Sequence, residues 1–172
     1  MTRIHSSSAV LLVLVIFSVS CNPRDSNIWG NQAVIDSLSH QVRVLTDSIS
    51  KSVNNKKLVA AFYQELFGDK NIEAIDKYIG DIYIQHNPSL PDGKEAIKDA
   101  AGKWFQGAPK DTIDLHHLGA DGDFVYIHTK AKFGDKTFSV LDIFRLENGK
   151  IVEHWDIIQE VPEQSMNSHP MF

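Results

Sequence analysis

The chain has 172 residues, of which 42% are hydrophobic and 23% are charged, a balance typical of a globular protein rather than of a disordered chain. Its 17 basic and 22 acidic residues give a formal net charge of −5, and no run rich in Lys and Arg interrupts this balance, which argues against nucleic-acid binding. The single cysteine, Cys21, excludes an intramolecular disulfide and a cysteine-rich metal site.

The first twenty residues have the features of an export signal. Arg3 supplies a positive charge, an uninterrupted apolar run occupies residues 9–17, and small residues follow. The run is too short to cross about 30 Å of hydrocarbon as a helix, but it fits a signal peptide over residues 1–20. Ser18–Cys21 resembles the bacterial lipobox, whose cysteine becomes the lipidated first residue of the mature protein. This resemblance implies an exported lipoprotein, anchored through Cys21 at the outer membrane or the periplasmic face. The alternative is a cleaved signal followed by an incidental cysteine.

A helical stalk is predicted after the signal. Residues 22–29 are rich in Asn, Pro, Asp and Ser, as is typical of a linker. Beyond them, apolar side chains recur alternately three and four residues apart, at Ile35, Leu38, Val42, Leu45 and Ile49. This spacing is the heptad seam of a helix. We interpret it as a stalk with weak self-association, and a helix packed on the domain is the alternative.

The stalk is expected to end at Asn54–Lys57, where the apolar pattern breaks. The chain then divides into a signal peptide (1–20), a lipidated linker with a helical stalk (21–56) and one domain with a C-terminal tail (57–172).

The domain is expected to combine three helices with a sheet. The predicted helices run from Leu58 to Gly68, from Asn71 to Ile79 and from Lys94 to Phe105, the last with Trp104 facing inward. A short extended segment, Tyr83–Pro88, separates the second and third helices. Four strands joined by short turns follow, at Thr112–Gly119, Phe124–Phe133, Thr137–Leu146 and Ile151–Glu160. This order predicts an α+β fold in which the helices pack on one face of a curved antiparallel sheet.

The last hairpin can form in two registers. A two-residue turn at Asn148-Gly149 would pair Leu146 with Ile151. A three-residue loop with Gly149 in a left-handed bulge would instead pair Leu146 with Lys150. A one-residue difference in register exchanges the two faces of a strand, so the turn decides which side chains meet.

We predict the bulged register because of the ionisable residues in these strands. It places Asp142, His154 and Asp156 on one face and lets Arg145 and Glu153 pair on the other. Carboxylates buried beside a histidine shift one another's pKa values, which is how a general base is obtained near neutral pH.

Several motifs make the domain recognisable. They are Tyr83–Pro88 with Asp92-Gly93, Asp121–His128, Asp142–Leu146 with Gly149–Asp156, and the closing Asn167–Phe172. Over about Leu58 to Phe172 the chain resembles the SnoaL-like proteins of the nuclear-transport-factor-2-like superfamily. The resemblance implies a cone-shaped α+β barrel whose sheet encloses a pocket for a small molecule. Relatives include polyketide cyclases, ketosteroid isomerase, scytalone dehydratase and limonene epoxide hydrolase. It also implies a homodimer, usually formed through the open face of the sheet.

The resemblance assigns roles to individual residues. In the cyclases an aspartate on the last strand abstracts a proton next to a carbonyl, and Asp156 matches that position. His154 is a candidate to orient Asp156 or to exchange a proton with it, and His86 and His128 are candidate general acids or substrate contacts. The candidates for lining the pocket are Asn87, Asp142, Phe144 and Trp104. No cofactor is expected. No metal is expected either, because His154 and Asp156 are the only close pair of potential metal ligands on one strand.

The chemistry leads to two functional hypotheses. The first is a cofactor-independent lyase or isomerase that abstracts a proton alpha to a carbonyl of a small molecule, with Asp156 as base. The second is a non-catalytic module that captures an apolar or amphipathic metabolite at the cell envelope. A structural role in assembly through the stalk is a third interpretation.

Overall fold

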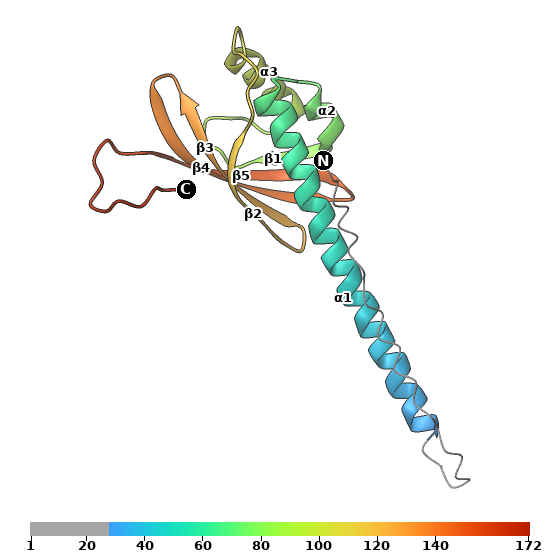
Figure 1. The fold of residues 1–172 in the computed structure, drawn as a ribbon. Helices are drawn as coiled ribbons and strands as arrows, with labels where there is room; N and C mark the ends of the chain where they lie inside the picture. The colour runs from blue at the N-terminus through green and yellow to red at the C-terminus, as the bar shows by residue number, and fades with distance from the viewer. Residues whose placement is uncertain (1–27) are drawn as a thin grey trace, which may run out of the picture. The chain divides into compact units, whose positions relative to one another are not determined.

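In a computed structural model the described residues are 28–172 (Figure 1). The predicted signal peptide, the lipidation site Cys21 and the linker lie outside them. The chain divides into two units between His40 and Gln41. The unit that begins at Gln41 contains the whole sheet. Among the described helices, none combines the length and the apolar character needed to span a membrane.

The first helix, α1, extends further than predicted. It runs from Ile28 to Tyr63 and continues as a π-helical turn, η1, from Gln64 to Gly68, so the predicted break at Asn54–Lys57 is wrong. Asn55 is buried, and its side-chain amide donates a 3.2 Å hydrogen bond to the Gly122 carbonyl. Because an asparagine inside a helix costs less than about 1 kcal/mol, contacts of this kind outweigh its low helix propensity. The predicted stalk and the first helix of the domain are therefore one helix.

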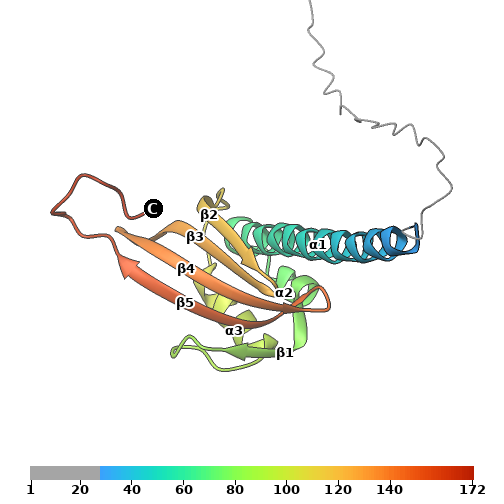
Figure 2. The same cartoon turned by 90° about the horizontal axis from the view of Figure 1, so that it is seen from below.

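Two shorter helices and five strands follow. The helices are α2 (Ala74–Tyr78) and α3 (Lys94–Trp104). The strands are β1 (Ile79–Gln85), β2 (Asp114–Asp121), β3 (Phe124–Phe133), β4 (Lys136–Glu147) and β5 (Lys150–Glu160). They form one sheet in the order β1-β5-β4-β3-β2, seen from below in Figure 2. The α+β fold and the four hairpin-linked strands are confirmed.

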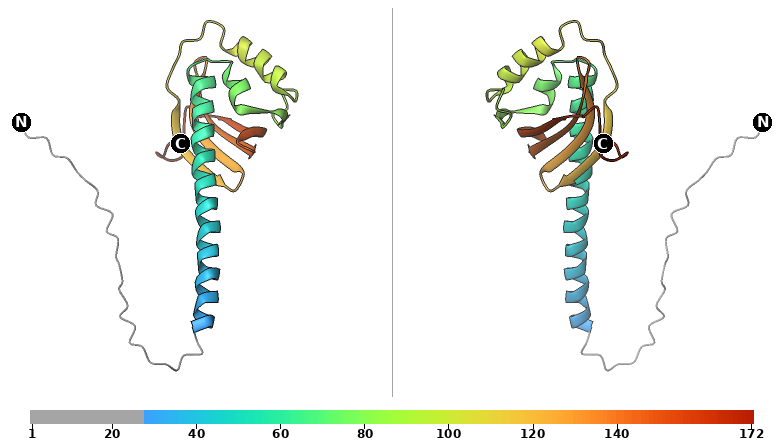
Figure 3. Two further views of the ribbon diagram at one scale, coloured as in Figure 1. Left: turned by 90° about the vertical axis from the view of Figure 1, so that its right-hand side faces the viewer. Right: turned by 90° about the vertical axis from the view of Figure 1, so that its left-hand side faces the viewer.

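The sheet is mixed rather than entirely antiparallel. Strands β2 to β5 pair antiparallel with their neighbours, but β1 pairs parallel to β5. Parallel pairing requires a long connection between the strands, and here α3 and the three other strands lie between them in sequence. The segment predicted only as extended, Tyr83–Pro88, overlaps the end of β1. The sheet therefore has one strand more than the four predicted. Figure 3 shows the curvature of the strands from two opposite sides.

The core lies between the helices and one face of the sheet, which we call the inner face. This face presents Val125, Ile127, Phe144, Leu146 and Ile151, all buried against apolar side chains of α1 and η1. Phe62 of α1 meets Phe144 edge to face, with ring centroids 5.8 Å apart, a favoured geometry for aromatic pairs. The opposite face, which we call the outer face, carries Tyr126, His128, Ser139, Leu141 and Trp155, since side chains alternate along a strand.

The β4–β5 hairpin differs in detail from the predicted one. Its turn is the two-residue Asn148-Gly149, with φ values of 51° and 73°, and Leu146 pairs with Ile151. The predicted three-residue loop is therefore wrong. However, the register shifts between Arg145 and Leu146, so that Val152 is an extra residue, a β-bulge. The bulge restores the predicted distribution of side chains between the two faces beyond it.

Gly149 provides a test of this turn. Its φ of 73° lies in the left-handed region, where a side chain costs about 1–2 kcal/mol. Gly149→Ala is therefore expected to lower the free energy of unfolding by that amount in urea titrations. The matched control is Gly102→Ala in α3, where the added Cβ meets only the Ile72 Cδ1 at 3.8 Å. There the same substitution is expected to stabilise the protein by about 0.5–1 kcal/mol. Equal effects at both positions would contradict the turn geometry.

Candidate active site

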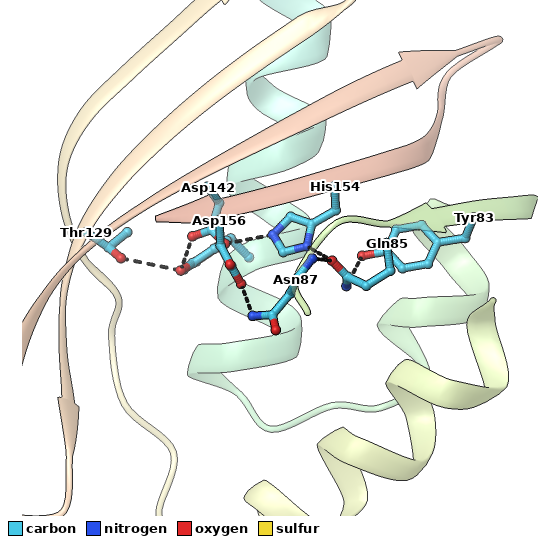
Figure 4. Close-up of polar contacts among 8 residues, drawn as sticks. Tyr83, Gln85, Asn87, Thr129, Asp142, His154 and Asp156 are labelled. Atoms are coloured by element: carbon cyan, nitrogen blue, oxygen red, sulfur yellow. Dashed lines mark hydrogen bonds and ion pairs between the residues drawn. The ribbon is translucent and has the colours of Figure 1, made fainter. Parts of the chain in front are cut away.

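Three ionisable side chains meet on the inner face, as predicted. Asp142 of β4 stands directly opposite Asp156 of β5 in the antiparallel register, and His154 lies two residues before Asp156 on the same face. Asp142 and His154 are buried, and Asp156 is half-buried. Figure 4 shows these side chains with those from neighbouring segments that bond to them.

Asp142 is bonded on both carboxylate oxygens. Its Oδ2 accepts a 2.8 Å hydrogen bond from the Tyr63 hydroxyl, and its Oδ1 lies 2.8 Å from Nε2 of His154. Thr129 Oγ1 lies 3.3 Å from the Tyr63 oxygen. Burial raises the pKa of Tyr63 well above its ordinary value, and the negative charge of Asp142 raises it further. The Tyr63 hydroxyl therefore stays protonated and donates to Asp142.

His154 faces hydrogen-bond acceptors on both ring nitrogens. Its Nδ1 lies 2.9 Å from Oε1 of Gln85, and that same oxygen accepts a 2.9 Å hydrogen bond from the Asn87 backbone N–H. Because a backbone N–H can only donate, the Gln85 atom must be the oxygen. With Asp142 ionised, His154 then donates from both nitrogens, and the two side chains form a buried ion pair.

This ion pair offsets the charges of the inner face. Two carboxylates directly opposite each other on adjacent strands repel, and the His154 cation beside Asp142 compensates one of them. The His154 ring also stacks on Phe144, with centroids 4.8 Å apart and planes inclined by 24°. Phe144 is itself buried. Instead of lining a pocket as predicted, it supports the His154 ring from within the core.

One carboxylate oxygen of Asp156 is hydrogen-bonded within the protein. Its Oδ2 accepts a 2.6 Å hydrogen bond from Nδ2 of Asn87. The orientation of the Asn87 amide is fixed because its Oδ1 accepts from the Ser89 backbone N–H at 2.8 Å. The other carboxylate oxygen of Asp156 receives no hydrogen bond from residues 28–172. Asp156 is thus the carboxylate of this cluster that has an oxygen available to another molecule.

Tyr83 and Gln85 belong to the site, although the sequence interpretation missed them. Gln85 Nε2 donates to the Tyr83 hydroxyl oxygen at 3.3 Å. Burial raises the pKa of Tyr83 far above its ordinary value, with contributions from Asp142 and Asp156. The hydroxyl therefore stays protonated, and its proton is available to an acceptor. The alternation of Tyr83, Gln85 and Asn87 within one recognised motif is the signal that places them on the same face.

The cluster also has the composition of a metal site. Asp142, His154 and Asp156 can each offer one ligand atom, and these atoms lie within 4.8 Å of one another. A metal ion there would have to replace the hydrogen bonds that these side chains make with each other and with Asn87. The donors are arranged for hydrogen bonding within the protein, which favours proton chemistry over metal binding.

Two of the predicted histidines lie away from the cluster. His86 is on the outer face, where its ring stacks on Trp155 at 4.4 Å and its Nε2 lies 2.8 Å from Oε1 of Glu153. It follows Gln85 directly, so the alternation of the strand turns it to the other side. His128 is also on the outer face, because it pairs with Leu141 rather than lying beside Asp142. The prediction that either reaches the cluster is wrong.

Trp104 is also misplaced by the sequence interpretation. It is the last residue of α3 and remains 49% exposed, whereas Ile97 and Ala101 of this helix are buried. The helix turns a narrower apolar stripe toward the core than predicted, so Trp104 neither faces inward nor joins the cluster.

The predicted pair of Arg145 and Glu153 is present on the outer face. The guanidinium Nε lies 2.6 Å from Oε2 of Glu153, in a directly opposed pairing rather than the predicted diagonal one. Hydrogen bonds from His86 and then from Arg145 lower the pKa of Glu153. Pairs of this kind near solvent contribute at most about 1 kcal/mol.

A groove of about 420 Å³ lies on the outer face. It is lined by His117, His128, Ser139, Leu141, Ile157, Gln159 and Met171. His128 Nδ1 lies 3.0 Å from Nδ1 of His117, and its Nε2 lies 2.7 Å from the Ser139 hydroxyl. Met171 belongs to the C-terminal tail, which therefore contacts this face. The groove contains none of the inner-face carboxylates, and it forms a separate feature of the surface.

The histidines of the groove predict a pH dependence of stability. Burial lowers the pKa of His128 below its ordinary 6.5, and His117 and His116 add to the effect. The unfolded state then binds more protons, so stability is complete above about pH 6.5 and falls as the pH drops toward the lowered value. Urea unfolding between about pH 7.5 and pH 5.5 is expected to show this loss, and His128→Gln is expected to reduce it. An unchanged slope in His128→Gln would contradict this assignment.

The family model of the SnoaL-like domain matches residues 59–154, more than half of the chain. This range runs from within α1 to within β5 and contains Tyr63, Asp142 and His154, whereas Asp156 lies two residues beyond its end. No protein of curated function matches the chain.

Solved structures with the same fold support this match. A provisionally assigned polyketide cyclase from Acidithiobacillus ferrooxidans is 22% identical, with a TM-score of 0.52 over 61% of this chain and 87% of that one. A provisionally assigned ketosteroid isomerase from Kribbella flavida is 16% identical, with a TM-score of 0.54 over 68% and 86%. An LEH-like epoxide hydrolase of M. tuberculosis is 18% identical, with a TM-score of 0.52 over 63% and 84%. At these identities the likeness establishes the fold and leaves the reaction to the site itself.

Proposed function

Because the chain belongs to the SnoaL-like domain family, we propose that its inner face binds a small carbonyl compound and abstracts a proton alpha to the carbonyl. The reaction would be of the lyase or isomerase type, as in aldol or cyclase chemistry, and would need no cofactor. Asp156 is the proposed base. The observation that carries the proposal is the different hydrogen bonding of two carboxylates on one face. In Asp142 both oxygens are hydrogen-bonded, whereas one oxygen of Asp156 receives no hydrogen bond from residues 28–172.

Asp142 is the carboxylate whose oxygens are both hydrogen-bonded within the protein. Its two oxygens are occupied by Tyr63 and His154, and it is buried, so it has no oxygen left for a substrate proton. Asp156 is half-buried and accepts one side-chain hydrogen bond from residues 28–172, that from Asn87. A carboxylate that is oriented on one oxygen and open on the other has the geometry of a general base.

Proton abstraction also needs a donor for the developing charge. As the C–H bond breaks, its proton passes to Asp156 and its electron pair moves toward the carbonyl oxygen. A hydrogen-bond donor at that oxygen stabilises the resulting enolate. Tyr83 is the proposed donor, because its hydroxyl is buried, remains protonated and accepts rather than donates its one bond within residues 28–172. It takes the role that the sequence interpretation gave to His86 and His128.

A non-catalytic binding module is the second candidate. Tyr63, Asp142, His154 and Gln85 form a continuous hydrogen-bonded chain within the protein. Such a chain stabilises a polar inner face without requiring turnover. In this alternative, Asp156, Asn87 and Tyr83 would orient the polar end of an apolar or amphipathic ligand.

The cellular setting is proposed from the sequence. The chain would be exported, lipidated at Cys21 and held at the outer membrane or the periplasmic face, where its ligand would be a metabolite of the envelope. Incorporation of a labelled fatty acid by the wild type, and its loss in Cys21→Ser, is the expected result. Labelling that persists in the variant would contradict lipidation at this residue.

A two-step screen tests the proposed reaction. The protein beginning after Cys21 would be mixed with small ketones, aldehydes and polyketide-like aromatic compounds while its melting temperature is followed. Compounds that raise the melting temperature would then be incubated in deuterated water. Deuterium uptake at the alpha carbon supports the enzyme. Stabilisation without uptake supports the binding module, and no stabilisation by any carbonyl compound contradicts the proposed reaction.

A further inference from the structure

One large apolar surface plays no part in the inner-face site. Every residue from Asn31 to Ser50 of α1 is exposed, and five of them form the apolar seam of the helix. These five, Ile35, Leu38, Val42, Leu45 and Ile49, are between 54% and 64% exposed. No described part of the chain covers them. An apolar stripe of this length left in water marks an interaction surface.

The residue types along the seam specify its partner. In heptad notation Ile35, Val42 and Ile49 occupy a positions, and Leu38 and Leu45 occupy d positions. Branching at Cβ in position a combined with leucine in position d favours a two-stranded parallel coiled coil. Only an in-register parallel pair of identical helices places like residues in each layer, isoleucine or valine in the a layers and leucine in the d layers.

The charges of the helix fit the same partner. The positions flanking the seam are held by Val34, Ser39, Gln41, Thr46 and Ser48, none of which is charged. The charged residues Asp36, Arg43 and Asp47 lie at b and f positions, away from the seam. A second copy would therefore meet no like charge across the contact, which removes the repulsion that often prevents a helix from pairing with itself.

We propose that α1 forms a parallel, two-stranded coiled coil with α1 of a second copy of this chain. A buried aliphatic side chain removes on the order of 100 Å² from water. Ten seam side chains, five from each copy, then bury on the order of 1,000 Å², near the lower limit of a specific interface. The pair is consequently weak in dilute solution and is favoured where the copies are concentrated on one membrane. This inference is independent of the proposed reaction.

Cysteine cross-linking in membranes of cells expressing the full chain tests the seam. In Leu45→Cys, a d position, the two thiols would face each other across the pair, and mild oxidation is expected to give a covalent dimer on non-reducing gels. The matched control is Asp47→Cys, an f position two residues away on the same exposed helix. It is expected to stay at the level of the wild type, whose only cysteine is Cys21. Equal cross-linking of both variants, or none in Leu45→Cys, would overturn the proposal.

Two further arms test orientation and interface. Co-expressed Ile35→Cys and Ile49→Cys chains are expected to cross-link only with their own kind, whereas an antiparallel pair centred on Val42 would join them to each other. Adding Leu38→Asp to Leu45→Cys is expected to abolish the cross-link, whereas Arg43→Asp at the outer b position is expected to preserve it. A cross-link that survives Leu38→Asp would place the association elsewhere, for example on the outer face of the sheet, and would overturn the proposal.

Discussion

Replacing Asp156 with asparagine is expected to lower the rate of proton exchange at the alpha carbon of a bound carbonyl compound by about 10²–10⁴-fold, the usual contribution of a positioned general base. Asparagine has the same shape and can still accept the hydrogen bond from Asn87 through its amide oxygen, but it cannot take up the substrate proton. The melting temperature should change little, since Asp156 is half-buried and lies outside the Asp142–His154 ion pair. Deuterium incorporation followed by NMR measures the rate.

The control for this substitution lies on the same strand. Glu153→Gln removes a carboxylate of β5 that faces the outer side, where it contacts His86 and Arg145. It is expected to leave the exchange rate within about twofold of the wild type, as is typical of a change away from the site. If both variants lose the same activity, the effect reflects general damage to the strand, and Asp156 would lose its assigned role.

The second large effect is expected at Asp142. Asp142→Leu removes one partner of a buried ion pair and leaves His154 and the Tyr63 hydroxyl without their shared acceptor. Breaking such a pair from one side costs about 3–5 kcal/mol, and the side chains of Asp142 and His154 are only 6% and 10% exposed, so water cannot readily substitute. Urea unfolding would measure the loss of free energy.

A double variant separates the ion pair from simple packing. If the cost of Asp142→Leu comes from an uncompensated His154, then adding His154→Phe should recover part of it, because an apolar pair of similar size can replace a buried ion pair without penalty. A coupling free energy between the two positions of about 0.5–3 kcal/mol is expected. Strictly additive losses would mean that the two side chains stabilise the fold separately, and the ion pair would be withdrawn.

Much of the fold could be predicted from local patterns. The strand Phe124–Phe133 has the bounds predicted, because alternating residues and turn glycines at both ends define it. The ionisable side chains that share the inner face were also predicted correctly, although the three-residue loop on which that prediction rested does not form. Relative to a plain two-residue turn, the extra residue at Val152 and the predicted three-residue loop each shift the register by one residue, in opposite directions. Either shift exchanges the two faces of β5, so both place Asp142, His154 and Asp156 together.

The rest depended on contacts between distant segments. Tyr63 reaches Asp142 from a helix 79 residues away in sequence, and no spacing rule connects them. The parallel pairing of β1 with β5 decides that Gln85 meets His154 and that His86 turns away, and a lone extended segment does not reveal its partner. The continuity of α1 through Asn54–Lys57 likewise follows from the contact of Asn55 with the β2–β3 turn rather than from propensity.

Asp156 is proposed to act as a base rather than as a binding group. The affinity of Asp156→Asn for a carbonyl compound that the wild type exchanges tests this most directly. Calorimetric titration of both proteins with the same compound gives the two dissociation constants. The predicted result is a similar Kd for both proteins with exchange lost only in the variant, because a base acts mainly in the transition state. A variant that loses affinity as much as exchange, or that exchanges as fast as the wild type, would contradict the role of Asp156 as base.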